Sequence, residues 1–435
     1  MCRPEEKTKI ISVVLDTQRK NVEVSMNILF ITLLDIRSID EYNIYADLMR
    51  CFAQKGHHVY IVSPVERKHA LPTQFLEDNR DELHGHVHIL KLKTGNIQKT
   101  NIIEKGISTL LLEYQLQTGI RKHLRNVHFD LVLYSTPPIT LVKPIRYVKK
   151  RDQAKTYLLL KDIFPQNAVD MGMMKKNGPK GLLYRFFRAK EKKLYALSDR
   201  IGCMSQANVD YVLRHNPEIA AERVEICPNS IEVRDMSVTV DERNTLRAKY
   251  GIPLDKKVFI YGGNLGKPQG IPFIIDCLKT QWENKDAFFL IVGDGTEFQQ
   301  LETWFQEVRP ENMKLLNRLP KEDYDRMVAA CDVGLIFLDH RFTIPNFPSR
   351  LLSYMQAGIP VLACTDPNTD IGKVITDAGF GWWCESNDAE AFSGIVKRIC
   401  TTGTLEMKNR AFSVLEERYD VKISEEIILS GSGPC

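Results

Sequence analysis

Short runs of apolar residues alternate along the chain with segments in which apolar residues recur every three to four positions. The first run, 26–32, precedes a segment in which Ile44, Leu48 and Phe52 share one helical face, and the run 59–64 follows that segment. A strand, a helix and a second strand in this order predict a parallel pair with a right-handed crossover. The chain therefore begins its fold with a β-α-β unit.

The same alternation continues to about residue 365 and is interrupted once. Further apolar runs predict strands at 87–92, 130–135, 156–162, 200–205 and 224–229. After a polar segment, strands are predicted again at 257–263, 287–295, 313–319, 333–338 and 360–365, with helices between them. The predicted fold class is α/β, with two Rossmann-like doubly wound domains facing across a cleft. Such folds bind ligands outside the carboxyl ends of their strands.

Patterning and composition shifts predict four segments. We expect residues 1–25 to be a weakly ordered extension and residues 26–235 to form the N-terminal domain. Residues 236–404 are predicted to form the second domain, and residues 405–435 a C-terminal helix with a flexible tail that ends in SGSGPC. A length of 435 residues fits two hydrophobic cores better than one.

Composition narrows the functional classes. The net charge of +4 is small for this length, which argues against a nucleic-acid partner, and the ten cysteines include no C-x-x-C pair. We therefore expect reduced thiols, no metal site and no disulfide framework. No apolar run approaches the ~18 residues that span a membrane, and the N-terminus lacks a signal peptide. These features predict a cytoplasmic protein.

A glycine-rich loop, 261–273, follows a predicted strand and opens a helix. Gly262 and Gly263 allow backbone N–H groups to approach a ligand closely, and Lys267 would then meet an anion. The loop is not a Walker A motif, and its alternative reading is a flexible turn. A second loop carries G-x-G at Gly293 and Asp294, for which tight-turn packing is the simpler explanation. No G-x-G-x-x-G opens either domain, which argues against a dinucleotide enzyme.

The segment 340–358 places Ser349 and Arg350 at the start of an apolar helix. An ordinary N-cap and a solvated charge are the alternatives. Two loops that converge on one cleft, however, predict a diphosphate site, with Arg350 making charge-assisted hydrogen bonds.

The N-terminal half offers one candidate side chain and one candidate surface. Lys161 and Asp162 leave a predicted strand, where Asp162 would face the cleft or cap a helix. Residues 181–197 interleave lysines and arginines with aromatic and aliphatic residues, and 143–151 is also basic. This pattern suits anionic lipid headgroups or a pyrophosphate-bearing acceptor, and its alternative reading is a half-buried helix with a solvated face.

The order of several motifs resembles the family-4 (group 1) retaining glycosyltransferases of the GT-B fold. The motifs are QKGHHVYIVSP, YALSDRIGCMSQ, VEICPNSIEV, YGGNLG, VGDG, CDVGLIFL and FPSRLLSYMQAGIPV. Within that family the chain is most similar to bacterial capsule, O-antigen and exopolysaccharide enzymes, including N-acetylfucosamine transferases. The resemblance implies an acceptor site in the N-terminal domain, a nucleoside-diphosphate sugar donor in the C-terminal domain, and no metal or other cofactor.

The resemblance also assigns roles to residues. In the mechanism that we expect, Lys267 and Arg350 stabilise the departing diphosphate, and Asp162 orients the acceptor or the sugar. The resemblance implies a donor-binding set made of Gly262, Gly263, Asn264, Gln269, Gly270, Gly293, Asp294, Arg318, Pro348, Ser349, Leu351 and Ser353. The chain departs from the family at four of its features, one of which is that the histidine of many members, near the position of Lys161, is missing. The usual arginine is Asn264, the usual lysine is Gln269, and the two usual glutamates are Pro345 and Ser353.

The expected activity is retaining transfer of a hexosyl or N-acetylhexosaminyl group to a lipid-pyrophosphate-linked or saccharide acceptor. The expected location is the cytoplasm, with peripheral contact to the inner membrane through the basic N-terminal domain. Two alternatives remain open at this point. One is a sugar-nucleotide epimerase on the same fold, and the other is a non-catalytic partner of a transferase.

Overall fold

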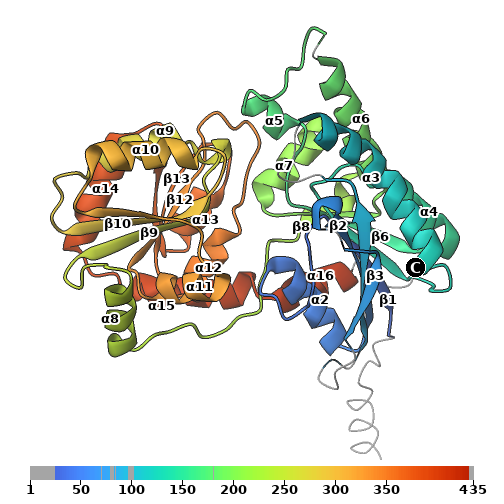
Figure 1. Cartoon of the computed structure of the whole chain (residues 1–435), viewed down its shortest axis with the longest axis horizontal. Helices are drawn as coiled ribbons and strands as arrows, with labels where there is room; N and C mark the ends of the chain where they lie inside the picture. Colours follow the sequence, from blue (N-terminus) through green and yellow to red (C-terminus); the bar gives the residue numbers. More distant parts are fainter. Residues whose placement is uncertain are drawn as a thin grey trace, which may run out of the picture.

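The computed structural model describes residues 25–69, 71–78, 83, 85–96, 102–179 and 181–430. Two domains lie side by side, each built on one sheet with helices on both faces (Figure 1). The predicted α/β class with two doubly wound domains is confirmed. Most of the predicted extension, 1–24, and the tail 431–435 lie outside the described residues.

The N-terminal sheet has eight strands in the order β3-β4-β2-β1-β5-β6-β7-β8. All neighbours are parallel except β3, an unpredicted edge strand that runs antiparallel to β4. The strands are β1 (Asn27–Ile31), β2 (His58–Glu66), β3 (Gln74–Asp78), β4 (Val87–Thr94), β5 (Leu131–Ser135), β6 (Lys155–Leu160), β7 (Arg200–Cys203) and β8 (Val224–Ile226). The helices are α2 (Ile44–Gln54), α3 (Ile102–His123), α4 (Val142–Asp152), α5 (Gln166–Asp170), α6 (Gly181–Leu197) and α7 (Gln206–His215).

The C-terminal sheet has six parallel strands in the order β11-β10-β9-β12-β13-β14. The strands are β9 (Lys257–Asn264), β10 (Ala287–Asp294), β11 (Met313–Leu316), β12 (Val333–Phe337), β13 (Val361–Thr365) and β14 (Gly381–Glu385). The helices are α8 (Val240–Lys249), α9 (Ile271–Lys279), α10 (Phe298–Val308), α11 (Lys321–Ala329), α12 (Arg350–Gln356), α13 (Ile371–Asp377), α14 (Ala389–Thr401), α15 (Leu405–Arg418) and α16 (Val421–Ser430). A 3₁₀ turn, η3 (Lys267–Gln269), follows β9.

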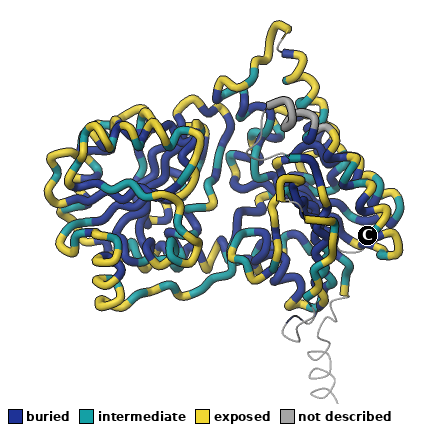
Figure 2. The backbone as a smooth tube through the Cα atoms, viewed as in Figure 1, coloured by how far each residue is buried: buried dark blue, intermediate teal, exposed yellow. Residues whose placement is uncertain are grey.

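Burial explains why the strands are almost continuously apolar. Every residue of β5, β12 and β13 is buried, because helices cover both faces of each sheet (Figure 2). Polar residues mark the ends of elements instead. Asn43 begins α2, and its side chain accepts hydrogen bonds from the backbone N–H groups of Tyr45 and Ala46.

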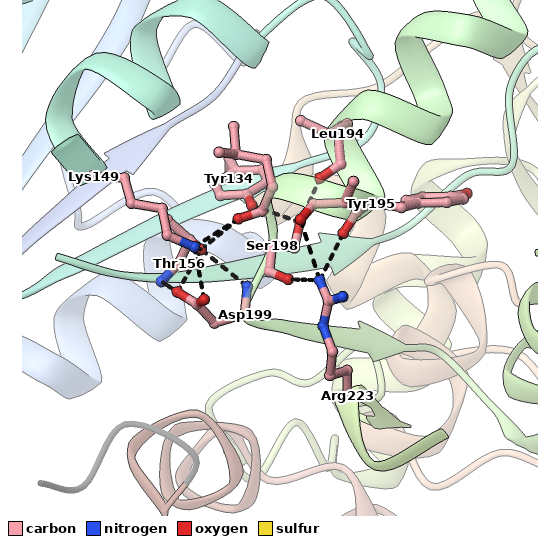
Figure 3. Close-up of polar contacts among 10 residues, drawn as sticks. Tyr134, Lys149, Thr156, Leu194, Tyr195, Ser198, Asp199 and Arg223 are labelled. Carbon is pink, nitrogen blue, oxygen red and sulfur yellow. Dashed lines mark hydrogen bonds and ion pairs between the residues drawn. The ribbon is translucent and has the colours of Figure 1, made fainter. Parts of the chain in front are cut away.

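A polar network fixes the C-terminal end of α6 to the sheet (Figure 3). The Arg223 guanidinium donates to the carbonyl of Tyr195 at 3.0 Å and to the carbonyl of Ser198. Asp199, which follows α6, forms an ion pair with Lys149 at 2.6 Å. This end of α6 is therefore anchored by charge-assisted hydrogen bonds.

The chain ends in a helix that the sequence pattern did not predict. Residues 421–430 form α16, which packs against α2 of the N-terminal domain, as the red and blue helices of Figure 1 show. Glu425 of α16 forms an ion pair with Lys55 at 2.6 Å. Backbone hydrogen bonds join the two segments that connect the domains. The Ile231 N–H donates to the Tyr419 carbonyl at 3.1 Å, and the Val421 N–H donates to the Ile231 carbonyl at 2.9 Å. The chain thus crosses between the domains twice, at adjacent points.

A buried ion pair joins α8 to the C-terminal sheet. Arg247 is 1 % exposed, and its Nη2 lies 2.7 Å from Asp332 Oδ2. Arg243, which is more exposed, pairs with the other carboxylate oxygen at 2.7 Å. Burial by itself raises the pKa of Asp332, but the Val258 N–H and the two guanidiniums outweigh burial and hold that pKa below its usual value. The carboxylate is therefore ionised and fully paired.

We predict that Arg247→Met lowers the free energy of unfolding of this domain by about 3–5 kcal/mol. The substitution leaves the buried Asp332 carboxylate with only the more exposed Arg243, and it removes the hydrogen-bond donor to the backbone carbonyls of Pro253 and Lys256. Arg243→Met is the matched control, with an expected cost of about 1 kcal/mol or less. All four tryptophans lie between residues 282 and 383. Urea unfolding followed by tryptophan fluorescence therefore reports on this domain. Equal effects of the two substitutions would contradict the prediction.

Candidate functional site

A cavity of ≈ 680 Å³ opens at the carboxyl ends of β9 and β10, beside the start of α12. This is the edge of a parallel sheet at which ligands of such folds bind. Most of the predicted donor-binding residues lie together here. The lining residues are Gly262, Gly263, Asn264, Val292, Gly293, Asp294, Arg318, Leu319, Lys321, Tyr324, Pro348, Ser349, Arg350 and Ser353.

Two glycines at the end of β9 allow side chains to pack directly on its backbone. A Cβ atom on Gly262 would lie 1.9 Å from the hydroxyl oxygen of Tyr324. A Cβ atom on Gly263, whose φ is +127°, would lie 3.1 Å from Nη2 of Arg350. The predicted reason for these glycines was close approach of a ligand. In the structure, close approach of Tyr324 and Arg350 already requires them.

Arg350 is a cation without a counter-ion. Its Cζ lies 4.3 Å from the ring centroid of Tyr261, a stacking distance for a guanidinium on an aromatic face. Its Nη1 is buried and has no hydrogen-bond partner. No carboxylate of the described residues forms an ion pair with Arg350, although Asp294 lines the same cavity. Since most buried arginines are paired, the guanidinium is available to an anionic ligand.

Ser349 does not act as a side-chain cap. It occupies the N-cap position of α12, but its side chain makes no capping hydrogen bond. The side chain is exposed and lines the cavity together with Pro348. The ordinary capping role considered for Ser349 therefore does not explain it.

The loop after β9 is held by Gln269. Its side-chain oxygen accepts hydrogen bonds from Asn264 Nδ2 at 2.9 Å and from the Gly266 N–H at 3.2 Å. Lys267 is exposed at the start of η3 and is not among the residues that line the large cavity. Gly270 has a φ of +64°, which favours glycine, and ends η3. The structure thus gives Gln269 and Gly270 positions that shape the loop.

Leu351 and Asp162 also lie outside the large cavity. Leu351 is fully buried in the hydrophobic core below α12. Asp162 follows β6, and its Oδ2 accepts a hydrogen bond from Asn167 Nδ2 at 2.6 Å. Burial raises the pKa of Asp162 to about 6. The hydrogen bond from Asn167 holds the Asp162 carboxyl group within the N-terminal domain.

Two aromatic residues of the site were not predicted from the sequence: Tyr324, which lines the cavity, and the buried Tyr261, which supports Arg350. The hydroxyl oxygen of Tyr324 is buried and has no hydrogen-bond partner. The neighbouring Tyr354 hydroxyl, in contrast, accepts from the Gly262 N–H at 3.3 Å and donates to the Leu335 carbonyl at 3.0 Å. Tyr324 lies in the first turn of α11, which follows a strand. That position in the sequence could have indicated a site residue.

Comparison with known proteins gives the same assignment as the sequence motifs. Residues 242–411 match the family described as Glycosyl transferases group 1. The probable glycosyltransferase WbjE of Pseudomonas aeruginosa is 26% identical over 330 residues, which cover 75% of this chain and 80% of WbjE. WcaI of Escherichia coli, a putative colanic acid biosynthesis glycosyl transferase, is 24% identical over 60% of this chain and 64% of its own.

A solved structure supports the fold. HepE of Anabaena, crystallised with UDP-glucose, superposes with a TM-score of 0.65 at 14% identity, covering 93% of this chain and 98% of HepE. The predicted resemblance to group 1 glycosyltransferases and the GT-B fold are confirmed.

We predict that Gly262→Ala lowers the free energy of unfolding by about 1–3 kcal/mol, because the added methyl group forces Tyr324 off the β9 backbone. Gly394→Ala is the matched control. Gly394 lies inside α14, where a Cβ atom would meet nothing within 4 Å, and alanine there is expected to stabilise by about 0.5–1 kcal/mol. Thermal unfolding of both variants checks the opposite signs. Two shifts of the same sign would refute the packing argument.

Proposed function

We propose, on the premise that residues 242–411 form a group 1 glycosyltransferase domain, that the chain moves a sugar from a nucleoside-diphosphate donor to an acceptor hydroxyl with retention of configuration. We propose further that the acceptor is lipid-linked or a saccharide, and that the reaction serves bacterial surface polysaccharide assembly. The polysaccharide role of the relative WcaI supports this pathway class. The UDP-glucose complex of HepE supports a nucleotide-sugar donor.

The observation that carries the proposal is the unpaired guanidinium of Arg350 in the large cavity. Two further cationic side chains, Arg318 and Lys321, line the same space, and of these Lys321 already pairs with Asp325. Asp294 is the one acidic side chain among the lining residues. A cavity with this excess of positive charge suits a diphosphate, which offers Arg350 several acceptor oxygens.

The transfer step follows from where this charge lies. The bond between C1 of the sugar and the oxygen of the outer phosphate breaks, and a bond from C1 to the acceptor oxygen forms on the same face. The acceptor proton passes to the departing phosphate oxygen. Negative charge grows on the diphosphate during the step, so Arg350 stabilises the transition state more strongly than the bound donor. Holding donor and acceptor together supplies the remaining acceleration.

We predict that Arg350→Gln weakens binding of the donor diphosphate by about 10-fold or more, because one charge-assisted hydrogen bond is worth about 1.5–3 kcal/mol. The matched control is Arg398→Gln, an exposed position on α14 that is not among the residues lining the cavity. Purified protein is titrated calorimetrically with a panel of nucleoside diphosphates and nucleotide sugars, and transfer to a lipid-pyrophosphate acceptor is followed by mass detection.

Binding to the wild type and the control, with loss in Arg350→Gln, supports the proposal. It is refuted if no member of the panel binds the wild type, or if the two substitutions have equal effects. Binding without transfer to any acceptor tested would instead favour a non-catalytic role.

We also propose that the protein meets an anionic membrane through the start of α6. Three apolar side chains there are strongly exposed, with Leu182 at 68%, Leu183 at 53% and Phe186 at 40%, and Met173 in the preceding loop is 62% exposed. The loop and the start of α6 project from the N-terminal domain (Figure 1). No helix of the described residues is long and apolar enough to cross a membrane.

The charges around α6 divide into two groups. Arg188, Lys190 and Lys192 are engaged in ion pairs with glutamates of the same domain. Lys175 and Arg185, beside the exposed apolar residues, are exposed and form no ion pair with the described residues. Exposed apolar residues bordered by unpaired cations are the combination that binds anionic bilayers.

We predict that the double substitution Leu182→Ser/Leu183→Ser reduces flotation of the protein with phosphatidylglycerol-containing vesicles by several-fold, because it removes apolar area that inserts between headgroups. Trp282→Ser, at a 58% exposed tryptophan of the other domain, is the control. Pure phosphatidylcholine vesicles test the electrostatic part. Equal flotation of both variants, or no preference for the anionic vesicles, would argue against this surface.

A further inference from the structure

A second cavity, of ≈ 260 Å³, lies between the two domains and adjoins the large one. The N-terminal domain contributes residues at the ends of β6, β7 and β8, and the C-terminal domain contributes η3 and the loop before α12. Pro348 and Ser349 line both cavities. A ligand in the large cavity can therefore extend past Ser349 into the smaller one.

Lys161 is the one ionisable side chain among the residues that line this smaller cavity. The remaining lining residues are apolar or carry amide and hydroxyl groups, such as Asn229, Gln269 and Asn346. The Lys161 ammonium donates to the carbonyls of Cys227 and Pro228, both at 3.3 Å. No carboxylate in the part of the chain that the structure describes forms an ion pair with it.

These contacts leave the ammonium form of Lys161 incompletely satisfied. Both neighbours are carbonyl oxygens, which only accept hydrogen bonds, so Nζ has to donate to them. An ammonium group has three donors, and the third has no acceptor among the described residues. Burial lowers the pKa of Lys161 because no opposite charge compensates it. Its neighbour Asp162 forms no ion pair with it and accepts a hydrogen bond from Asn167 instead.

We propose that the smaller cavity receives the sugar of the donor, and that this sugar carries a carboxylate which Lys161 binds. The inference rests on the proposed function, because it takes the large cavity as the diphosphate site. In a nucleotide sugar the sugar is attached directly to the outer phosphate. With the outer phosphate on the Ser349 side of the large cavity, the group that enters the adjoining space is the sugar.

The charge balance selects the class of sugar. A neutral hexose would leave the Lys161 ammonium without a counter-ion in a cavity whose other lining groups are uncharged. A hexuronic acid would supply the missing acceptor and the opposite charge at once, and such charge-assisted hydrogen bonds are about twice as strong as neutral ones. Lys161 is then a specificity-determining residue, and the donor is an acidic sugar nucleotide.

The test compares donors that differ only at C6 of the sugar. UDP-glucuronic acid is paired with UDP-glucose, and UDP-galacturonic acid with UDP-galactose, in calorimetric titrations of the full chain. UDP alone is titrated first. We expect the acidic member of at least one pair to bind wild type about 10-fold tighter than its neutral partner. We expect Lys161→Met to abolish that ratio without changing the affinity for UDP.

Two further variants keep the result interpretable. Lys161→Arg retains the charge and is expected to retain a preference for the acid, and Lys397→Met removes an exposed lysine of α14 as the matched control. Melting temperatures without ligand show that each variant is folded. An acid-to-neutral ratio that is the same in wild type and Lys161→Met overturns the inference while leaving the proposed function intact. Failure of UDP and of all nucleotide sugars to bind wild type overturns both.

Discussion

The close packing of Arg350 and Tyr324 on the backbone of β9 is the constraint on which the site depends. Gly262 and Gly263 lie near the end of the strand; a Cβ atom on Gly262 would collide with Tyr324, and one on Gly263 would crowd Arg350. The packing places a guanidinium on the face of Tyr261 at the edge where the strands end. It also fixes the first turn of α12 against the sheet. The position of the unpaired Arg350 guanidinium in the large cavity is a consequence of this contact region.

The sequence identified the parts of the site that lie on one local segment. Gly262, Gly263, Ser349 and Arg350 were recognised because each stands at a strand end or a helix start, and position within an element is a local pattern. Tyr324 was missed because its importance comes from contact with a glycine more than sixty residues earlier. Contacts of that separation leave no periodic signal.

Most of the overall fold was also predictable from local patterns, except for the strand β3 and the helix α16. Strands that are buried on both faces read as unbroken apolar runs, so the order of the two sheets' strands along the chain was visible. The short edge strand β3 and the helix α16 were not. β3 is mostly exposed and carries charges. α16 owes its burial to α2, which lies near the other end of the chain.

The two crossings of the chain between domains bear on how the cleft opens. The first passes Ile231 and the second passes residues 419–421, and backbone hydrogen bonds tie the two together. Two connecting segments that run side by side between the domains form a hinge. Two such connections restrict twisting and sliding of one domain on the other. Rotation about an axis that passes through both connections is the least restricted motion. We therefore expect rotation about the two crossings to be the main relative motion of the domains. The packing of α16 on α2, with its Lys55–Glu425 ion pair, holds the second crossing against the N-terminal domain.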